Sequence, residues 1–167
     1  MKTTVLAVDP GVAATGVVLV CGGRITEVHT WTTKPASIDR WRDLQARAGL
    51  QALRILDHLE ALPGGAHVVI EAFEDFGGGH LREAHSRYYT PFLLGYVAAR
   101  VVQHPIHLHW QAASVVLRAT RAYREHWEAG RRGLVPGDEL LTNEHLRSAA
   151  CHAVHLEGAL RVGRGVA

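Results

Sequence analysis

The order of the hydrophobic patterns is the feature that most restricts what this chain can fold into. Three short strand-like runs follow one another at residues 3–8, 16–20 and 25–32, and strands joined so closely predict an antiparallel meander. Helical and strand-like patterns then alternate: helix 37–62, strand 67–71, helix 81–103, strand 106–110, and helices 112–119 and 143–160. This order predicts an α/β fold with a five-stranded mixed sheet, three antiparallel strands plus two parallel, flanked by helices.

Length and composition limit the class of protein. The chain has 167 residues, 47% of them hydrophobic and 20% charged, which predicts one globular domain over residues 1–167. No apolar run approaches the roughly 20 residues that span a bilayer, and the N-terminal residues contain no apolar signal segment. We therefore expect a cytoplasmic protein, in a bacterial or phage-infected cell, with no membrane partner. The net charge of +2 permits an anionic partner without requiring one.

Two acidic residues end strand-like runs in this pattern. Asp9 ends the first strand, where Pro10 and Gly11 permit a tight exit, and Glu71 ends the fourth. If these strands are parallel neighbours, the two carboxylates converge and form a site for a hard divalent cation, Mg²⁺ with Mn²⁺ as a substitute. Such a site suits two-metal hydrolysis of a phosphodiester. The alternatives are an ordinary Asp-Pro-Gly turn and a purely structural Glu71.

These motifs resemble those of the RuvC-type Holliday-junction resolvases of the RNase H-like superfamily. Residues 5–11 (VLAVDPG) with Gly16 resemble the family's first-strand motif, and residues 68–71 (VVIE) resemble its second acidic strand. Residues 112–116 resemble the short helix after the fifth strand, and residues 143–152 the last helix with the C-terminal metal ligands. The resemblance covers nearly the whole chain, and phage-encoded members look closest. It implies an RNase H-like fold, a homodimer and an Mg²⁺-dependent endonuclease acting on four-way DNA junctions.

The last helix departs from the family's pattern at one position. The family usually has an acidic residue or His and, three positions later, an Asp followed by Ala; here His145 matches, but Ser148 stands where the Asp is expected. A neutral hydroxyl is a poor Mg²⁺ ligand. Glu144 shares a helix face with Ser148 and either reaches the site or only complements the helix dipole. The predicted catalytic residues are Asp9, Glu71, Glu144, His145 and Ser148. All of these except Ser148 are also predicted to be metal ligands.

A second group of residues is predicted to contact DNA. Phe73 and Phe76 lie near three consecutive glycines, and an aromatic ring on a glycine loop suits a wedge in an opened duplex. The alternative places both rings in the core. Arginines in the following helix and after residue 117 suit phosphate, with a solvated charged face as the alternative. The predicted DNA contacts are Phe73, Phe76, Arg82, Arg87, Tyr88, Arg118 and Arg121.

Histidines and apolar helix positions allow further interpretations. The chain has 12 histidines, but the spacing of those in the last helix and in strand 106–110 does not match the usual zinc ligands, so no structural zinc is predicted. Helix 81–103 is interrupted by Pro91, which should kink or restart it. Its apolar positions, which include Leu93, Tyr96 and Val97, either bury a partner protomer or pack on the chain's own sheet.

The residues and the resemblance together predict a structure-selective DNA endonuclease that resolves Holliday junctions or other branched DNA. Asp9 would bridge two Mg²⁺ ions, Glu71 would hold one, and His145 would ligate a metal or orient the attacking water. One alternative is a catalytically weakened junction-binding protein of the same fold, because of Ser148. Another is an actin-like ATP-binding protein, which also begins D-x-G-x-x-x-x-G but needs two lobes, for which 167 residues leave little room.

Overall fold

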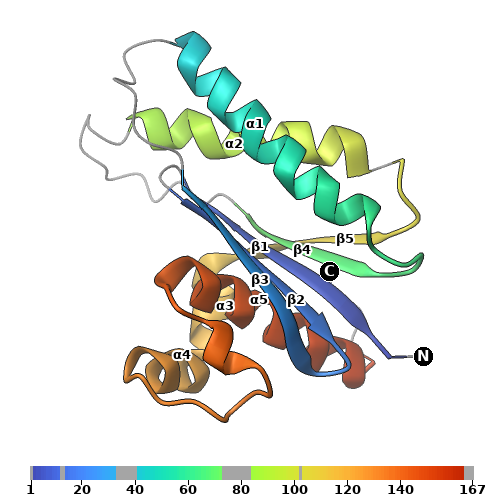
Figure 1. Ribbon diagram of the computed structural model, residues 1–167, viewed down its shortest axis with the longest axis vertical. Helices are drawn as coiled ribbons and strands as arrows, with labels where there is room; N and C mark the ends of the chain where they lie inside the picture. Colours follow the sequence, from blue (N-terminus) through green and yellow to red (C-terminus); the bar gives the residue numbers. More distant parts are fainter. Residues whose placement is uncertain (1, 12–13, 33–40, 73–83, 102, 164–167) are drawn as a thin grey trace.

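A single mixed sheet organises the chain (Figure 1). The computed structural model describes residues 2–11, 14–32, 41–72, 84–101 and 103–163, with the backbone alone described for residues 41–44 and 84–90. The strand order is β3-β2-β1-β4-β5. The strands are β1 (Thr4–Pro10), β2 (Ala14–Cys21), β3 (Arg24–Thr32), β4 (His67–Ala72) and β5 (His107–Ala112). Strand β2 is antiparallel to β1 and β3, whereas β4 is parallel to β1 and β5. The predicted fold class is confirmed.

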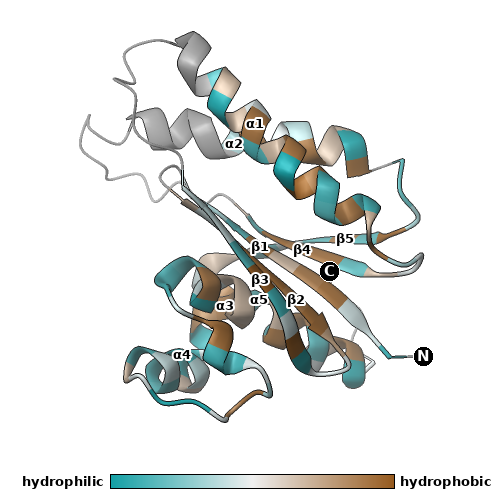
Figure 2. Ribbon diagram, in the orientation of Figure 1, coloured by the Kyte–Doolittle hydropathy of each residue, from teal (hydrophilic) through white to brown (hydrophobic). Residues whose placement is uncertain are grey.

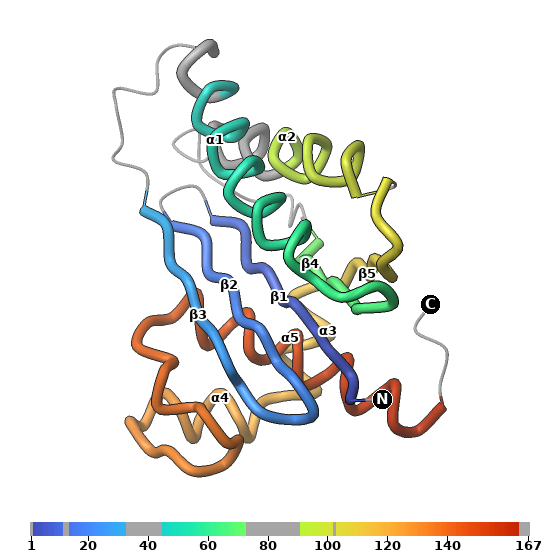
Figure 3. The backbone as a smooth tube through the Cα atoms, turned by 45° about the vertical axis from the view of Figure 1, so that its right-hand side comes forward, coloured from blue at the N-terminus to red at the C-terminus, as the bar shows by residue number. Residues whose placement is uncertain are grey.

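Helices cover both faces of the sheet (Figures 1 and 3). The helices are α1 (Trp41–Glu60), α2 (Ala84–Val101), α3 (Ala113–Ala119), α4 (Arg121–Glu128), the 3₁₀ helix η2 (Asp138–Leu140) and α5 (Glu144–Arg161). Helices α1 and α2 lie on one face, and α3, α4 and α5 lie on the other. Helix α2 continues through Pro91, so it does not restart there. In the described part of the chain, no helix has the length and apolarity needed to cross a membrane.

Alternating strand residues build one core on each face of the sheet, and the ribbon coloured by hydropathy shows hydrophobic residues along the central strands (Figure 2). In β1, Val5 and Ala7 face α5, whereas Leu6 and Val8 face α1 and α2. The apolar side of α2, including Leu93, is buried in the second core. Helix α2 therefore packs mainly on its own sheet, which was one of the two interpretations of its apolar positions.

Residues 120–142 are more ordered than their weak sequence pattern indicates, because one buried carboxylate organises them. Asp138 is 1% exposed. Its two oxygens accept hydrogen bonds from the backbone N–H groups of Gly133, Leu134 and Val135 and from the indole N–H of Trp127, at 2.9–3.2 Å. Burial acts to raise the pKa of Asp138, but these hydrogen bonds outweigh it and the pKa is lowered. The segment lies beside β3, where the Ile25 N–H donates to the Pro136 oxygen at 2.8 Å.

Candidate active site

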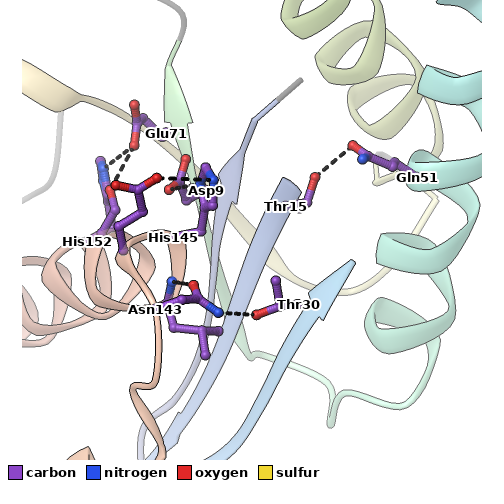
Figure 4. Close-up of polar contacts among 11 residues, drawn as sticks. Asp9, Thr15, Thr30, Gln51, Glu71, Asn143, His145 and His152 are labelled. Carbon is purple, nitrogen blue, oxygen red and sulfur yellow. Dashed lines mark hydrogen bonds and ion pairs between the residues drawn. The ribbon is translucent and has the colours of Figure 1, made fainter. Parts of the chain in front are cut away.

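Two carboxylates meet at the C-terminal ends of adjacent parallel strands. Because Val8 of β1 pairs with Ile70 of β4, the next residues along the two strands are Asp9 and Glu71. Their side chains are 13% and 24% exposed, respectively. Both line a pocket of about 260 Å³ that opens to solvent. The expected parallel pairing of the two strands is thus observed, and it brings the two predicted acids to one site (Figure 4).

Helix α5 carries the other side of this pocket. Asn143 caps the helix: its side-chain oxygen accepts a hydrogen bond from the Leu146 N–H at 3.0 Å. The same side chain donates from Nδ2 to Thr30 Oγ1 at 2.9 Å, which ties the helix start to β3. His145 and Ser148 follow on one helix face, and both line the pocket with Asp9 and Glu71.

Two glycines of the strand motif let α5 approach the sheet this closely. A Cβ atom on Gly16 would lie 2.5 Å from both the backbone carbon and the oxygen of His145. A Cβ atom on Gly11 would lie 2.3 Å from the Ala14 oxygen and 2.9 Å from His145 Cε1. Both separations are shorter than van der Waals contact. These glycines are therefore part of how the chain places His145 next to Asp9.

Asp9 and His145 form the central polar pair. His145 Nδ1 lies 3.1 Å from Asp9 Oδ2. The pKa of Asp9 is raised, chiefly by burial and further by the nearby Glu71, and the contact with His145 only partly offsets this. The pKa of His145 is also raised, first by its hydrogen bond to Asp9 and against the effect of its own burial. Burial thus penalises a negative charge that a cation near Asp9 would stabilise.

Glu71 is held from α5 by two side chains, one of which was not predicted. Ser148 Oγ donates to Glu71 Oε2 at 3.2 Å, and His152 Nε2 lies 3.2 Å from the same oxygen. The His152 side chain is fully buried, and its Nδ1 lies 3.2 Å from Gln111 Oε1 on β5. His152 shares a helix face with His145 and Ser148, and this spacing is visible in the sequence. The same spacing is also expected of a helix face that only packs on the sheet, so it did not identify His152 as a site residue.

The remaining pocket residues include one predicted acid and two basic side chains. The Glu144 side chain is 84% exposed, and its Oε1 lies 3.9 Å from His145 Nε2. Glu144 therefore lies at the solvent rim, beside His145 and not beside Glu71. Arg124 and Arg147 also line the pocket. Arg124 belongs to the arginines after residue 117 that were interpreted from the sequence as suited to phosphate, whereas Arg147 was not predicted as a site residue.

The predicted DNA contacts do not all fall within the described part of the chain. Phe73, Phe76 and Arg82 lie outside the described residues. Arg87 and Tyr88 belong to α2, but their side chains are not described. Arg118 is exposed in the last turn of α3, outside the pocket lining. Arg121 begins α4 and forms an exposed ion pair with Glu125 at 2.6 Å.

The residues around the pocket suit a hard divalent cation. Asp9 and Glu71 offer carboxylate oxygens, the ligands that Mg²⁺ and Mn²⁺ prefer. The raised pKa of the buried Asp9 indicates that its negative charge is incompletely compensated by the protein. Ser148 donates its hydroxyl hydrogen to Glu71, so in this arrangement it supports a ligand carboxylate.

Comparison with known proteins identifies the fold. No protein-family model matches the chain, and no curated protein matches it in sequence. Among solved structures, Thermus thermophilus RuvC superposes with a TM-score of 0.64 and 16% identity, covering 97% of this chain and 98% of that chain. T. thermophilus RuvC in complex with a Holliday junction substrate superposes with a TM-score of 0.63 and 17% identity, covering 97% of both chains. The chain therefore has the RNase H-like fold in the form found in RuvC.

Proposed function

We propose that this protein is a metal-dependent endonuclease that cuts phosphodiester bonds in branched DNA. The observation that carries the proposal is the convergence of Asp9, Glu71 and His145 on one open pocket. These side chains come from β1, β4 and α5, and two of them are acids at the ends of adjacent parallel strands. The fold shared with RuvC, one of whose structures contains a Holliday junction, supports branched DNA as the substrate.

Asp9 and Glu71 would hold the cation, Mg²⁺ or Mn²⁺. When bound, two such ions activate water and stabilise the leaving oxygen of a phosphodiester. Ser148 and His152 contact Glu71 Oε2 and so fix the orientation of its carboxylate. Asp9 is fixed in the same way by His145.

His145 is suited to act on the attacking water. Its Nδ1 faces Asp9, so Nε2 is the nitrogen left to accept a proton from water. The contact with Asp9 raises the pKa of His145, which makes the ring a better proton acceptor near neutral pH. This favours water orientation over metal ligation, the two roles that the sequence left open for His145. Glu144, whose Oε1 lies 3.9 Å from Nε2, would stabilise the positive charge that develops on the ring.

Phosphate contacts would come from arginines around the pocket. Arg124 and Arg147 line it, and a guanidinium group pairs with phosphate oxygens in a bidentate geometry. Arg118 and Arg121 extend this basic surface along α3 and α4 and remain proposed contacts, with Arg121 exchanging Glu125 for phosphate. Phe73, Phe76, Arg82, Arg87 and Tyr88 remain predictions from the sequence, as do the resemblance to phage-encoded members and the cytoplasmic location.

A homodimer is part of the proposal, because a four-way junction requires two nicks. An apolar groove of about 710 Å³ between α1 and α2 is lined by Leu50, Leu53 and Tyr96. These side chains are 49%, 59% and 47% exposed, more than large apolar groups usually are. Light scattering of the full chain would measure the oligomeric state, and Leu53→Glu should shift a dimer towards monomer.

One alternative has a specific observation in its favour. Ser148 places a neutral hydroxyl beside Glu71, at the position where the family pattern has a carboxylate. Fewer carboxylates bind divalent cations more weakly, and the protein would then bind junctions with little cleavage. An actin-like ATPase has no such support, since the described residues form one five-stranded sheet and not two lobes.

A nicking assay on a synthetic four-way junction, with Mg²⁺ and then Mn²⁺, tests the proposal. We expect nicking by the wild type, and loss of nicking with retained junction binding in Asp9→Asn and Glu71→Gln. Glu139→Gln is the matched control, because Glu139 is exposed on η2 and outside the pocket lining. Nicking that survives in Asp9→Asn, or absence of junction binding by the wild type, would contradict the proposal.

A further inference from the structure

A second cluster of metal-ligating side chains lies outside the catalytic pocket. Glu27 and His29 occupy alternate positions of β3, and His58 lies in the last turn of α1. One ligand atom from each residue can be chosen so that all three lie within 4.8 Å of one another. None of the three lines the pocket of Asp9 and Glu71. The cluster has no part in the function proposed above.

The fold explains why these three residues meet. Alternate residues of a strand face the same side, so Glu27 and His29 share a face of β3 with Trp31, which packs on the α1–α2 core. The His58 ring lies 4.3 Å from the His29 ring and 5.3 Å from the Trp31 ring, measured between centroids. The end of α1 is thus docked directly over this face of β3.

We propose that Glu27, His29 and His58 bind one transition-metal ion of the zinc class. Two imidazole nitrogens and one carboxylate form a ligand set used by Zn²⁺. Imidazole nitrogen suits Zn²⁺, Ni²⁺ and Cu²⁺, whereas Mg²⁺ prefers an all-oxygen environment. The site is therefore chemically distinct from the one at Asp9. The side chains of Glu27 and His29 are 49% and 35% exposed, which leaves room for water as a fourth ligand.

The bound ion would connect the edge of the sheet to a helix. Among the described residues, β3 is the outermost strand beside β2 and pairs with another strand on one side only. Edge strands open more readily than central ones, because half of their backbone groups lack a strand partner. An ion held by two residues of β3 and one of α1 would resist that opening. Metal binding to the folded chain would therefore raise its melting temperature.

The competing explanation needs no metal. Glu27 Oε1 already lies within hydrogen-bonding distance of His29 Nε2, at 2.5 Å, and the packing of the His29, His58 and Trp31 rings against one another accounts for the ring positions. The two explanations differ in a measurable way. A metal site requires all three side chains for one binding event, whereas a hydrogen bond beside packed rings gives no saturable binding of Zn²⁺.

The proposal is tested by titrating the full chain with Co²⁺ and with Zn²⁺. Excess Mg²⁺ is present in both titrations to occupy the carboxylates of the catalytic pocket. We expect one Zn²⁺ per chain by calorimetry, and visible Co²⁺ absorption bands typical of nitrogen and oxygen ligands. Paramagnetic Co²⁺ should also quench the fluorescence of Trp31, whose ring lies 5.3 Å from that of His58. The melting temperature should rise with Zn²⁺ in the same concentration range.

Variants locate the ion. His58→Ala and Glu27→Gln should weaken Zn²⁺ binding by more than about tenfold, since even the loss of a group that only supports a metal ligand costs about that much. Glu27 is exposed on the strand, so its variant keeps the fold even if His58→Ala does not. His104→Ala, a histidine outside the cluster, is the matched control, and Asp9→Asn should keep the Co²⁺ bands. A second pair of histidines, His67 of β4 and His109 of β5, has ring nitrogens 2.9 Å apart. Unchanged Zn²⁺ affinity in Glu27→Gln, or loss of binding on replacing His67 or His109 instead, would overturn the proposal.

Discussion

Replacing Gly16 by alanine should move the start of α5 and separate the central polar pair. The added Cβ atom would lie 2.5 Å from the His145 backbone carbon and oxygen, whereas ordinary contacts of a Cβ atom lie at 3.4–4 Å. The helix start must therefore shift by about 0.9 Å, because backbone atoms cannot turn aside as a flexible side chain can. His145 Nδ1, now 3.1 Å from Asp9 Oδ2, would move to about 4 Å, beyond hydrogen-bonding distance.

The size of the effect follows from this displacement. Overpacking of this kind costs about 1–3 kcal/mol of stability, and a misplacement of about 1 Å at a catalytic group costs on the order of 100-fold in rate. The pKa of His145 should fall, because its hydrogen bond to Asp9 is the main cause of the raised value. We therefore expect Gly16→Ala to remain folded, to nick a four-way junction about 100-fold more slowly, and to show a lower His145 pKa by NMR titration.

Gly158→Ala is the matched control for this substitution. Gly158 also lies on α5, but a Cβ atom there meets nothing within 4 Å. The control should gain about 0.5–1 kcal/mol, because alanine loses less backbone entropy than glycine in a helix, and its nicking rate should equal that of the wild type. If Gly16→Ala nicks junctions at the control's rate and keeps the wild-type His145 pKa, then close approach of α5 does not set the geometry of the pocket.

Three further predictions follow from the same structure. Asp138→Ala leaves buried N–H groups unpaired, so it should lower the free energy of unfolding measured in urea by at least about 3 kcal/mol. Because the folded-state pKa of Asp138 is lowered, the carboxylate stabilises the fold above its unfolded pKa of about 3.9, and this stabilisation is lost as pH falls through the folded pKa. The variant should therefore lose less stability on acidification than the wild type. The nicking rate of the wild type should rise with pH and level off above the raised pKa of His145. His145→Ala should nick junctions about 10²–10⁴-fold more slowly and should lack this rise. An unchanged pH profile in the variant would exclude His145 as the proton acceptor. Ser148→Asp should tighten Mg²⁺ binding measured by calorimetry and speed nicking, because it adds a carboxylate beside Glu71; weaker Mg²⁺ binding would show that the serine's hydrogen bond to Glu71 matters more than charge.

The sheet and the acidic pair could be predicted because both depend on local pattern. A strand of alternating or fully apolar residues has a definite length and end, so Asp9 and Glu71 were recognisable as strand-end carboxylates before the fold was known. Parallel pairing of their strands was only a condition of the sequence-based prediction, and the structure meets that condition. The N-cap at Asn143 was equally local, since it needs only a polar side chain before a helical pattern.

Contacts between distant elements could not be predicted in this way. The contact of His152 with Glu71 depends on how deeply α5 sits against the sheet, and Gly16 permits that depth only through its spatial neighbour His145. The order of residues 120–142 likewise depends on one carboxylate, Asp138, whose partners are brought together by loop geometry and not by periodicity.

The cluster of Glu27, His29 and His58 could not be predicted for the same reason. Zinc-ligand spacing is recognisable only within one helix or strand, whereas this cluster joins β3 to the end of α1. The docking of α1 over β3 brings His58 to Glu27 and His29, and no spacing in the sequence encodes that docking. The spacing of histidines in the sequence therefore excluded only zinc motifs whose ligands lie close together along the chain.

The central claim is that Asp9 and Glu71 form one cation site, and a crystal structure of the protein soaked in Mn²⁺ tests it most directly. We predict anomalous density in the pocket between the two carboxylates, at metal–oxygen distances of about 2.0–2.6 Å, and no such density in Asp9→Asn crystals soaked in the same way. Carboxylates separated by more than about 8 Å with no ion between them would contradict the account, since one cation cannot bridge that gap.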